Sequence, residues 1–256
     1  MNATARGLCS DSQGNIFIVN SSSITEFAHG GTSPINTIHN LSYNYFSCSV
    51  DPTTGNLAVT LQDSYGHAGI GVFKNATGTQ ITYADSDFSK FDYCGYDGSG
   101  NLFADGYTGR APAAFAELGV GQSALKTVTL NRDIRRPGQV QWDGENMTIA
   151  DEQAHKLYRV SINTSAATVT GTTKIDGFPN VFSGSWIYGG MLIAPFSRKH
   201  RGYIGFWKYP EGGSPTKTLG IIYLTKLALP GKVGAWASLT SRVLSSKPSV
   251  TLPISK

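Results

Sequence analysis

Hydrophobic and polar residues alternate in short runs along the chain, and polar, glycine-rich turns separate the runs. The clearest example lies at residues 91–105, where Phe-Asp-Tyr-Cys-Gly-Tyr is followed by Asp-Gly-Ser-Gly-Asn and then by Leu-Phe-Ala-Asp. Short alternating runs bounded by Gly and Asn are typical of β-hairpins. The pattern therefore predicts two strands joined by a tight turn at Gly100-Asn101.

This hairpin pattern recurs at a regular interval. The turns are Gly14-Asn15, Gly55-Asn56, Gly100-Asn101, Glu145-Asn146 and Gly189-Gly190, and a hydrophobic run follows each of them. Their spacings are roughly 41, 45, 45 and 44 residues, within the range of about 40–50 that is typical of propeller blades. One further step of about 42 residues leads to Gly231-Lys232, which begins a less regular sixth copy.

Each copy continues with two more runs, as at residues 24–27 and 35–38 of the first copy. Four short strands per copy predict one four-stranded antiparallel sheet per repeat. The chain is thus expected to be all-β, a six-bladed β-propeller whose last blade is irregular, forming a single domain over residues 1–256. The predicted blades cover residues 7–38, 46–83, 92–130, 138–175, 182–219 and 220–256.

A ring is favoured because a small sheet cannot bury both of its faces alone. Stacking the sheets around an axis buries both faces and leaves only short edges. The alternative is an open β-solenoid, whose coils are usually shorter than about 40 residues. In the last copy, residues 235–244 also fit a short helix by their apolar spacing.

Composition and charge limit the partners and the compartment. The formal net charge is +4, and the basic residues are divided among separate loops, which argues against nucleic acid as the primary partner. No run approaches the roughly 20 apolar residues of a transmembrane helix, and the first residues do not resemble a signal peptide. Abundant Asn, Ser and Thr with few Lys and Glu favour an extracytoplasmic setting.

The three cysteines share one position in the repeat. Cys9, Cys48 and Cys94 each lie on the predicted first strand of a copy, and Val140 and Gly184 occupy this position in the next two copies. A position that accepts Cys, Val or Gly is expected to be small and tightly packed near the axis. The odd number of cysteines argues against a disulfide framework, so buried thiols are expected.

The fourth copy reads Ala-Asp-Glu-Gln-Ala-His-Lys-Leu-Tyr-Arg-Val at residues 150–160. It resembles the NHL repeat, and the Gly-Asn-Leu turns resemble those of the SMP-30/gluconolactonase group of six-bladed propellers. The latter resemblance implies a divalent cation on the axis, held by a Glu near the start of the chain and by Asn and Asp from other blades. Residues 1–25 contain no Glu. The sequence therefore favours a binding propeller over a lactonase.

Candidate ligand-binding residues lie in the loops between the second and third strands and in the links between copies. In propellers that resemble this one, these loops share one face, here called the long-loop face. Its histidine, tyrosine and arginine side chains suit a small anionic or carbohydrate ligand, or a protein partner, because arginine pairs with carboxylate or phosphate through two hydrogen bonds. The candidates are Tyr43, His67, Arg110, Arg135, Arg136, His155, Arg198 and His200.

Three aspartates of the same face, Asp63, Asp105 and Asp151, come from neighbouring copies. Together they could hold Ca²⁺ or another divalent cation, since hard cations prefer oxygen ligands. The alternative is that each carboxylate accepts hydrogen bonds from its own turn. Two hypotheses follow: a non-catalytic monomeric propeller that needs no cofactor and binds a partner on the long-loop face, or a divergent metal-dependent lactonase or hydrolase.

Overall fold

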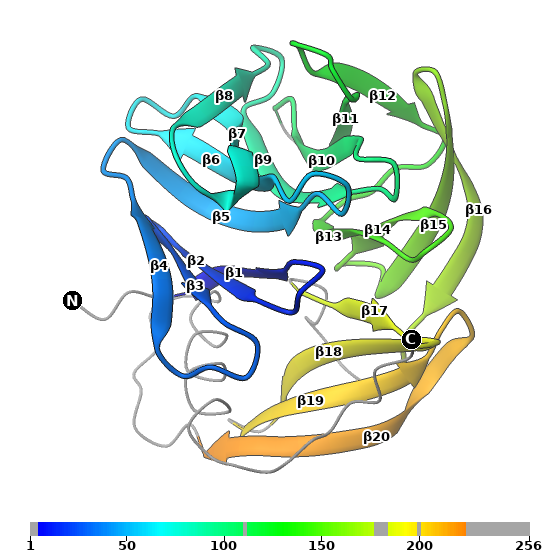
Figure 1. The fold of residues 1–256 in the computed structure, drawn as a ribbon. Coiled ribbons are helices and arrows are strands. Elements are labelled where there is room, and N and C mark those ends of the chain that lie inside the picture. The colour runs from blue at the N-terminus through cyan, green and yellow to red at the C-terminus, as the bar shows by residue number, and fades with distance from the viewer. Residues whose placement is uncertain (1–4, 110–111, 177–183, 199–200, 224–256) are drawn as a thin grey trace.

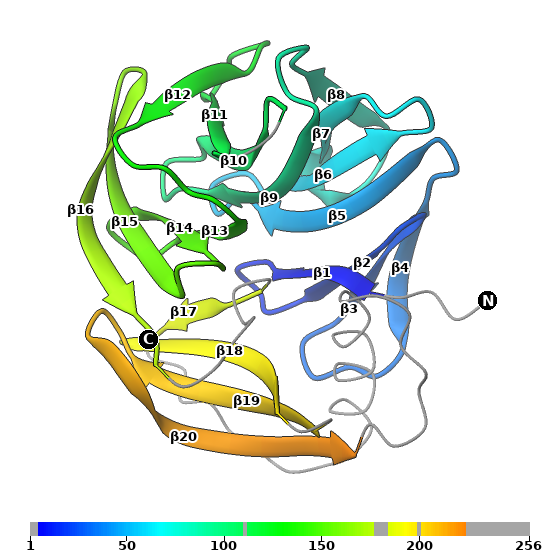
Figure 2. The ribbon, with the colours of Figure 1, turned by 180° about the vertical axis from the view of Figure 1, so that it is seen from behind.

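The computed structural model describes residues 5–109, 112–176, 184–198 and 201–223, and this part of the chain is an all-β structure. Its twenty strands form five groups of four that surround a common centre (Figure 1). The first strand of each group is innermost and the fourth lies at the rim, as both views show (Figure 2). No helix in these ranges is long and apolar enough to cross a membrane.

The first two sheets are antiparallel, and each has its strands in chain order. A single-turn 3-10 helix, η1 (Lys74–Ala76), connects the last two strands of the second sheet. The strands are β1 (Ala5–Ser10), β2 (Ile16–Asn20), β3 (Ser23–Phe27) and β4 (Pro34–His39), then β5 (Tyr43–Val50), β6 (Leu57–Asp63), β7 (Ala68–Phe73) and β8 (Gln80–Ala84).

The next three groups repeat the same order of antiparallel strands. They are β9 (Lys90–Tyr96), β10 (Leu102–Tyr107), β11 (Ala114–Leu118) and β12 (Lys126–Leu130), then β13 (Pro137–Trp142), β14 (Met147–Asp151), β15 (Lys156–Asn163) and β16 (Ala166–Lys174), and finally β17 (Trp186–Tyr188), β18 (Met191–Arg198), β19 (Arg201–Lys208) and β20 (Gly212–Tyr223). The prediction of an all-β chain with four-stranded antiparallel sheets is confirmed.

The described residues include only the start of the predicted sixth blade. Strand β20 continues beyond the predicted last strand of the fifth copy and includes residues 220–223. The rest of the predicted sixth blade, residues 224–256 with its strand or helix alternatives, lies outside the described residues.

The third and fourth sheets are joined at the rim, which the sequence pattern did not predict. Strand β12 pairs with β16 in parallel through Thr129 with Ala166 and Leu130 with Ala167. Asn131 strengthens the junction, because its side-chain Oδ1 accepts a hydrogen bond of 2.9 Å from Val169 N. The two sheets thereby form one eight-stranded sheet.

In the described ranges, the hydrophobic core forms four layers, each between two neighbouring sheets. The layer between the first two sheets, for example, contains Phe17, Leu57 and Phe73. The second strands of the middle sheets are buried on both faces, as in β14, where all five residues are buried. Outer strands such as β4 contain only exposed and half-buried residues. This gradient explains why the second strands of the middle copies are rich in apolar residues on both faces.

Hydrogen bonds and backbone conformation explain why the repeated turn contains Asp, Gly and Asn. In the third sheet, Asp97 accepts hydrogen bonds from the backbone N–H and the side-chain Nδ2 of Asn101, at 2.9 and 2.8 Å. Asn101 Oδ1 then accepts the backbone N–H of Val120 in the turn between β11 and β12, at 3.1 Å. Gly100 has φ +88°, a conformation that glycine adopts without strain. The Asn101 side chain thus links the turn between β9 and β10 to the turn between β11 and β12.

Candidate functional site

A cavity of about 410 Å³ lies on the axis, where the first strands of the sheets converge. It is lined along the whole of β1, from Ala5 to Ser10, and by residues of β5, β9 and β13. Ser185 and Trp186 at the start of the fifth sheet complete this inner wall, and Ile193, Pro195 and Ile204 contribute from its later strands. The volume falls within the range of about 300–1,000 Å³ that is usual for ligand pockets.

Small residues let the inner strands approach one another around this cavity. A Cβ atom added to Gly7 of β1 would lie 2.8 Å from Phe46 O of β5. One added to Gly95 of β9 would lie 2.6 Å from Val140 O of β13. Any larger residue at either place would force neighbouring backbones apart, so the expected tight packing near the axis holds at these strands.

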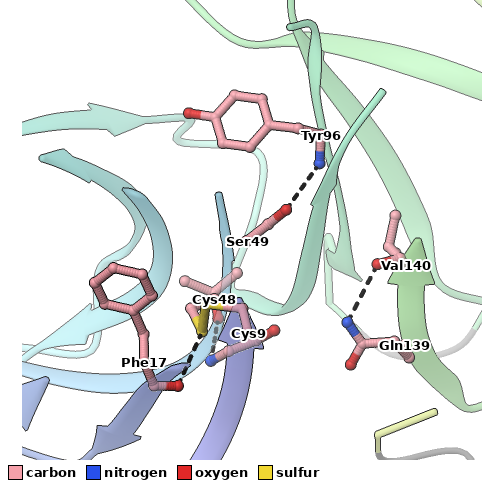
Figure 3. The surroundings of a disulfide bond; sticks show 9 residues. Cys9, Phe17, Cys48, Ser49, Tyr96, Gln139 and Val140 are labelled. Atoms are coloured by element: carbon pink, nitrogen blue, oxygen red, sulfur yellow. Dashed lines mark hydrogen bonds between the residues drawn. A yellow bond between two sulfur atoms is a disulfide. The ribbon is translucent and has the colours of Figure 1, made fainter. Parts of the chain in front are cut away.

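The expectation that all three cysteines are free thiols was wrong. Cys9 and Cys48 form a disulfide between β1 and β5, with Cα atoms 5.7 Å apart, and both line the cavity (Figure 3). The pairing follows from convergence at the axis, which brings equivalent positions of consecutive sheets together despite a separation of 39 residues. Cys94 is a free, buried thiol, as predicted, and burial raises its pKa to about 12.

Three polar side chains of the cavity wall bind groups of the protein itself. Ser49 Oγ accepts the backbone N–H of Tyr96 at 3.0 Å, which links the second and third sheets (Figure 3). Gln139 Nε2 donates to the carbonyl of its neighbour Val140 at 3.2 Å. With its amide oriented to pair both groups, Gln141 donates to Ser185 O at 2.9 Å and accepts from Ile187 N at 3.0 Å. Ser49 and Gln141 therefore hold neighbouring sheets together.

A charged cluster lies where the first strands begin, on the long-loop face. The Lys90 ammonium pairs with the Asp92 carboxylate, and Arg136 Nε lies 2.7 Å from Glu152 Oε2. Burial raises the pKa of the Glu152 carboxyl, and the Arg136 guanidinium opposes this shift.

The aromatic ring of Phe46 lies beside this cluster, and two cationic side chains lie over its face. The Arg6 guanidinium lies 4.8 Å from the ring centroid, and Lys90 Nζ lies 5.7 Å from it. A cation over an aromatic face is held by the negative potential of the ring. The contact places Arg6 at the long-loop end of the cavity.

Asp105 is the most deeply buried of the three predicted metal ligands, with 1 % of its surface exposed. Its Oδ1 accepts the backbone N–H of Tyr93 at 2.9 Å, at an irregularity in the pairing of β9 with β10. Its Oδ2 has no hydrogen-bond partner among the described residues. Burial raises the pKa of Asp105 well above its usual range, and the neighbouring Asp92 carboxylate raises it further. Burial therefore favours the neutral form of this carboxyl.

The other two aspartates accept hydrogen bonds from their own loops. Asp63 Oδ1 accepts the backbone N–H groups of Tyr65 and His67, and Asp63 Oδ2 lies 2.8 Å from His67 Nδ1. Asp151 Oδ1 accepts the N–H groups of Gln153 and Ala154. Within the described ranges, no three His, Cys, Asp or Glu side chains are arranged to hold a metal ion.

The predicted ligand residues fall into two groups on different sheets. Tyr43 pairs with Asp63 across β5 and β6, which places it near His67. Arg135 donates its backbone N–H to Asp151 Oδ2 at 3.4 Å, and Arg136 lies beside it. His155 lies in the loop that Asp151 organises, with φ +54°. Arg110, His200 and the side chain of Arg198 lie outside the described residues.

The sequence did not identify Arg6, Phe46, Asp92 or the residues that line the cavity. Arg6, Phe46, Asp92 and most of the lining residues lie on first strands, which the pattern assigned to inter-sheet packing. The available signal was the start of each first strand, because Arg6, Lys90 and Arg136 lie at or next to it. In a ring, the starts of the first strands converge at the axis, so the residues at these starts were candidates for one site.

No protein-family model matches the chain, and no curated protein matches its sequence. Solved structures do resemble it. A protein of unknown function from Bacteroides caccae aligns with a TM-score of 0.61 and 13 % identity, over 86 % of this chain and 82 % of that one.

Two further solved structures resemble the chain. A chain of a nidogen/laminin complex aligns with a TM-score of 0.62 and 16 % identity, over 85 % and 80 % of the two chains. A chain of a mitotic checkpoint complex aligns with a TM-score of 0.57 and 11 % identity, over 84 % of this chain and 63 % of that one. At such identities the likeness concerns the fold alone, which is a β-propeller.

Proposed function

We propose that this β-propeller is a non-catalytic binding module whose ligand enters the axial cavity from the long-loop face. The observation that carries the proposal is the cavity itself, about 410 Å³ in volume and lined by the inner strands of all five described sheets. Ligand pockets are typically concave and mostly apolar, with a few placed polar groups. Trp142, Trp186 and Tyr96, together with Arg6, give the cavity this character.

Binding is favoured over metal-dependent hydrolysis by the way the carboxylates are used. Asp63 and Asp151 accept hydrogen bonds from their own loops, and Asp105 is buried beneath the surface of its sheet. A hydrolase would need carboxylates directed at a shared point to hold a cation and activate water. The cavity wall contains no carboxylate among the residues that the structure describes.

We further propose a six-bladed ring of the NHL or SMP-30 kind, in an oxidising compartment. The repeat spacing supports six copies, and the loop from Asp151 to Lys156 supports the NHL likeness. The Cys9–Cys48 disulfide supports the compartment, because disulfides persist chiefly in secreted, periplasmic or other oxidising environments.

Tryptophan emission offers a direct test, because Trp142 and Trp186 line the cavity. A library of small organic fragments would be screened by tryptophan emission and thermal shift on the unmodified protein and on Gln139→Phe. The phenylalanine would fill cavity space, so fragments are expected to bind at least about tenfold more weakly, the equivalent of losing about 1.4 kcal/mol of contacts.

Gln153→Phe is the matched control, because Gln153 is exposed in a loop of the same face. It should bind fragments like the unmodified protein, and circular dichroism should show both variants folded. Equal fragment binding by Gln139→Phe, or no binding by any form, would overturn the axial cavity as the ligand site.

A further inference from the structure

The axial cavity has two chemically different ends. At the long-loop end, Arg6 lies near the start of β1. At the opposite end, Ser10, Tyr96 and Trp142 close their first strands just before the repeated turns. From Arg6 to Ser10, β1 spans four residue steps, or roughly 13 Å at about 3.3 Å per residue. The cavity is therefore elongated, with a cation at one end and aromatic rings at the other.

Arg6 differs from the other cations near it. Lys90 pairs with Asp92, and Arg136 pairs with Glu152. Arg6 contacts only the face of Phe46, and no carboxylate pairs with it within the ranges that the structure describes. Its guanidinium thus keeps its fork of N–H donors, which matches the geometry of a carboxylate.

Away from Arg6, the wall offers a ligand large apolar contacts. Ser49 Oγ is already bound to Tyr96 N, and both ends of the Gln141 amide bind the fifth sheet. Val140, Trp142 and Ile193 line the cavity beside them. An apolar body therefore finds contacts along the wall beyond the cation.

We infer that the cavity binds a small organic carboxylate with an elongated apolar or aromatic body. The carboxylate lies on Arg6 at the long-loop end, and the body extends along β1 toward Tyr96 and Trp142. The inference rests on the proposed function and adds to it the chemical class and orientation of the ligand. Phe46 holds the guanidinium in place from the other side.

The test compares ligands that share a body and differ in charge. The acids 4-phenylbutyrate and octanoate would be measured beside their primary amides, by saturation-transfer NMR and tryptophan emission. The unmodified protein should bind each acid at least about tenfold more tightly than its amide, because hydrogen bonds between two charged groups are stronger than those to a neutral amide. The comparison of acid with amide uses the unmodified protein alone, so it does not depend on the folding of a variant.

Variants then assign the preference to Arg6. Arg6→Gln should weaken acid binding at least about tenfold and leave amide binding unchanged. The Arg6→Glu variant should not bind the acids and should bind 4-phenylbutylamine instead, because the charges of the side chain and of the ligand are then both reversed. Arg132→Gln is the matched control, because Arg132 lies at an exposed position over the ring of Tyr158. It should bind like the unmodified protein.

The outcomes separate the two proposals. Equal binding of acid and amide, or acid binding that Arg6→Gln does not weaken, would overturn the carboxylate inference and leave the binding cavity standing. Failure of every acid, amide and amine to bind, together with failure of the fragment screen, would overturn both.

Discussion

Asp105 shows how a single buried carboxyl can serve the fold. Its Oδ1 supports the backbone of β9 where the pairing with β10 is irregular, and its Oδ2 is buried without a partner among the described residues. In the second sheet, Thr60 makes the equivalent contact, because its Oγ1 accepts Ser47 N at 3.0 Å. Asp105 and Thr60 therefore play the same structural part, each as an acceptor for the backbone of the first strand.

Replacing Asp105 with asparagine should change how stability depends on pH. The pKa of Asp105 is raised in the folded state, so its contribution to stability is fully present below the unfolded pKa of about 3.9 and is lost as pH rises through the folded pKa. Between these values, the free energy of unfolding of Asp105→Asn should rise relative to the unmodified protein, by at most about 1.4 kcal/mol per pH unit.

Denaturant unfolding at pH 4, 5.5 and 7 measures this change. Asp87→Asn, at an exposed position in the link before β9, controls for the loss of one negative charge. A stability difference between Asp105→Asn and the unmodified protein that stays constant from pH 4 to 7 would contradict a neutral Asp105.

At the scale of the element, the repeated turn is the unit that the sequence describes best. Its Asp, Gly and Asn residues have local roles, so the pattern is visible without knowledge of the ring. Alternation then predicted the strands, and several boundaries differ by a few residues, as at β5, which begins at Tyr43, and at β20, which includes Tyr223. The junction between β12 and β16 pairs strands of two different copies, so no local pattern encodes it.

Replacing Asn101 with alanine should destabilise the third sheet. The change removes the hydrogen bonds from Nδ2 to Asp97 and from Val120 to Oδ1, and it keeps the backbone bond to Asp97. At about 1 kcal/mol per hydrogen bond, we expect a loss of about 2 kcal/mol in the free energy of unfolding. For a chain of this size, the melting temperature should fall by about 4–8 °C.

Asn146→Ala is the matched comparison for Asn101→Ala. In the fourth turn, the backbone N–H of Asn146 binds Asp143, while its side chain makes no hydrogen bond within the described part of the chain. The melting temperature of Asn146→Ala should therefore fall less than that of Asn101→Ala. Equal losses for the two variants, measured by calorimetry, would show that the side-chain bridge of Asn101 contributes nothing.

At the scale of the whole molecule, the axis brings together residues that the sequence keeps apart. Cys9 and Cys48 occupy equivalent positions in consecutive copies, and the odd count of cysteines hid their pairing. Arg6 and Phe46 were likewise invisible as a pair, because each follows the strand pattern of its own copy. Local patterns predict sheets, whereas the site depends on how the sheets converge.

Removing the disulfide should destabilise the whole protein. Cys9→Ser combined with Cys48→Ser opens a loop of about 39 residues in the unfolded chain, and we expect a loss of about 2–5 kcal/mol in the free energy of unfolding. Dithiothreitol should lower the melting temperature of the unmodified protein and leave the double variant unchanged. Three titratable thiols in the denatured, non-reduced protein would contradict the pairing.

The parallel junction of β12 with β16 also decides where another chain could add a strand. An outer strand exposes unpaired backbone groups, and these are a template for a strand from another molecule. At residues 129–130 and 166–167 these groups already pair with each other. Among the described residues, β4 and β8 end their sheets without such a junction and carry exposed Ile35 and Ile81. The outer edges of the first two sheets are therefore more open to a strand from another molecule than those of the third and fourth.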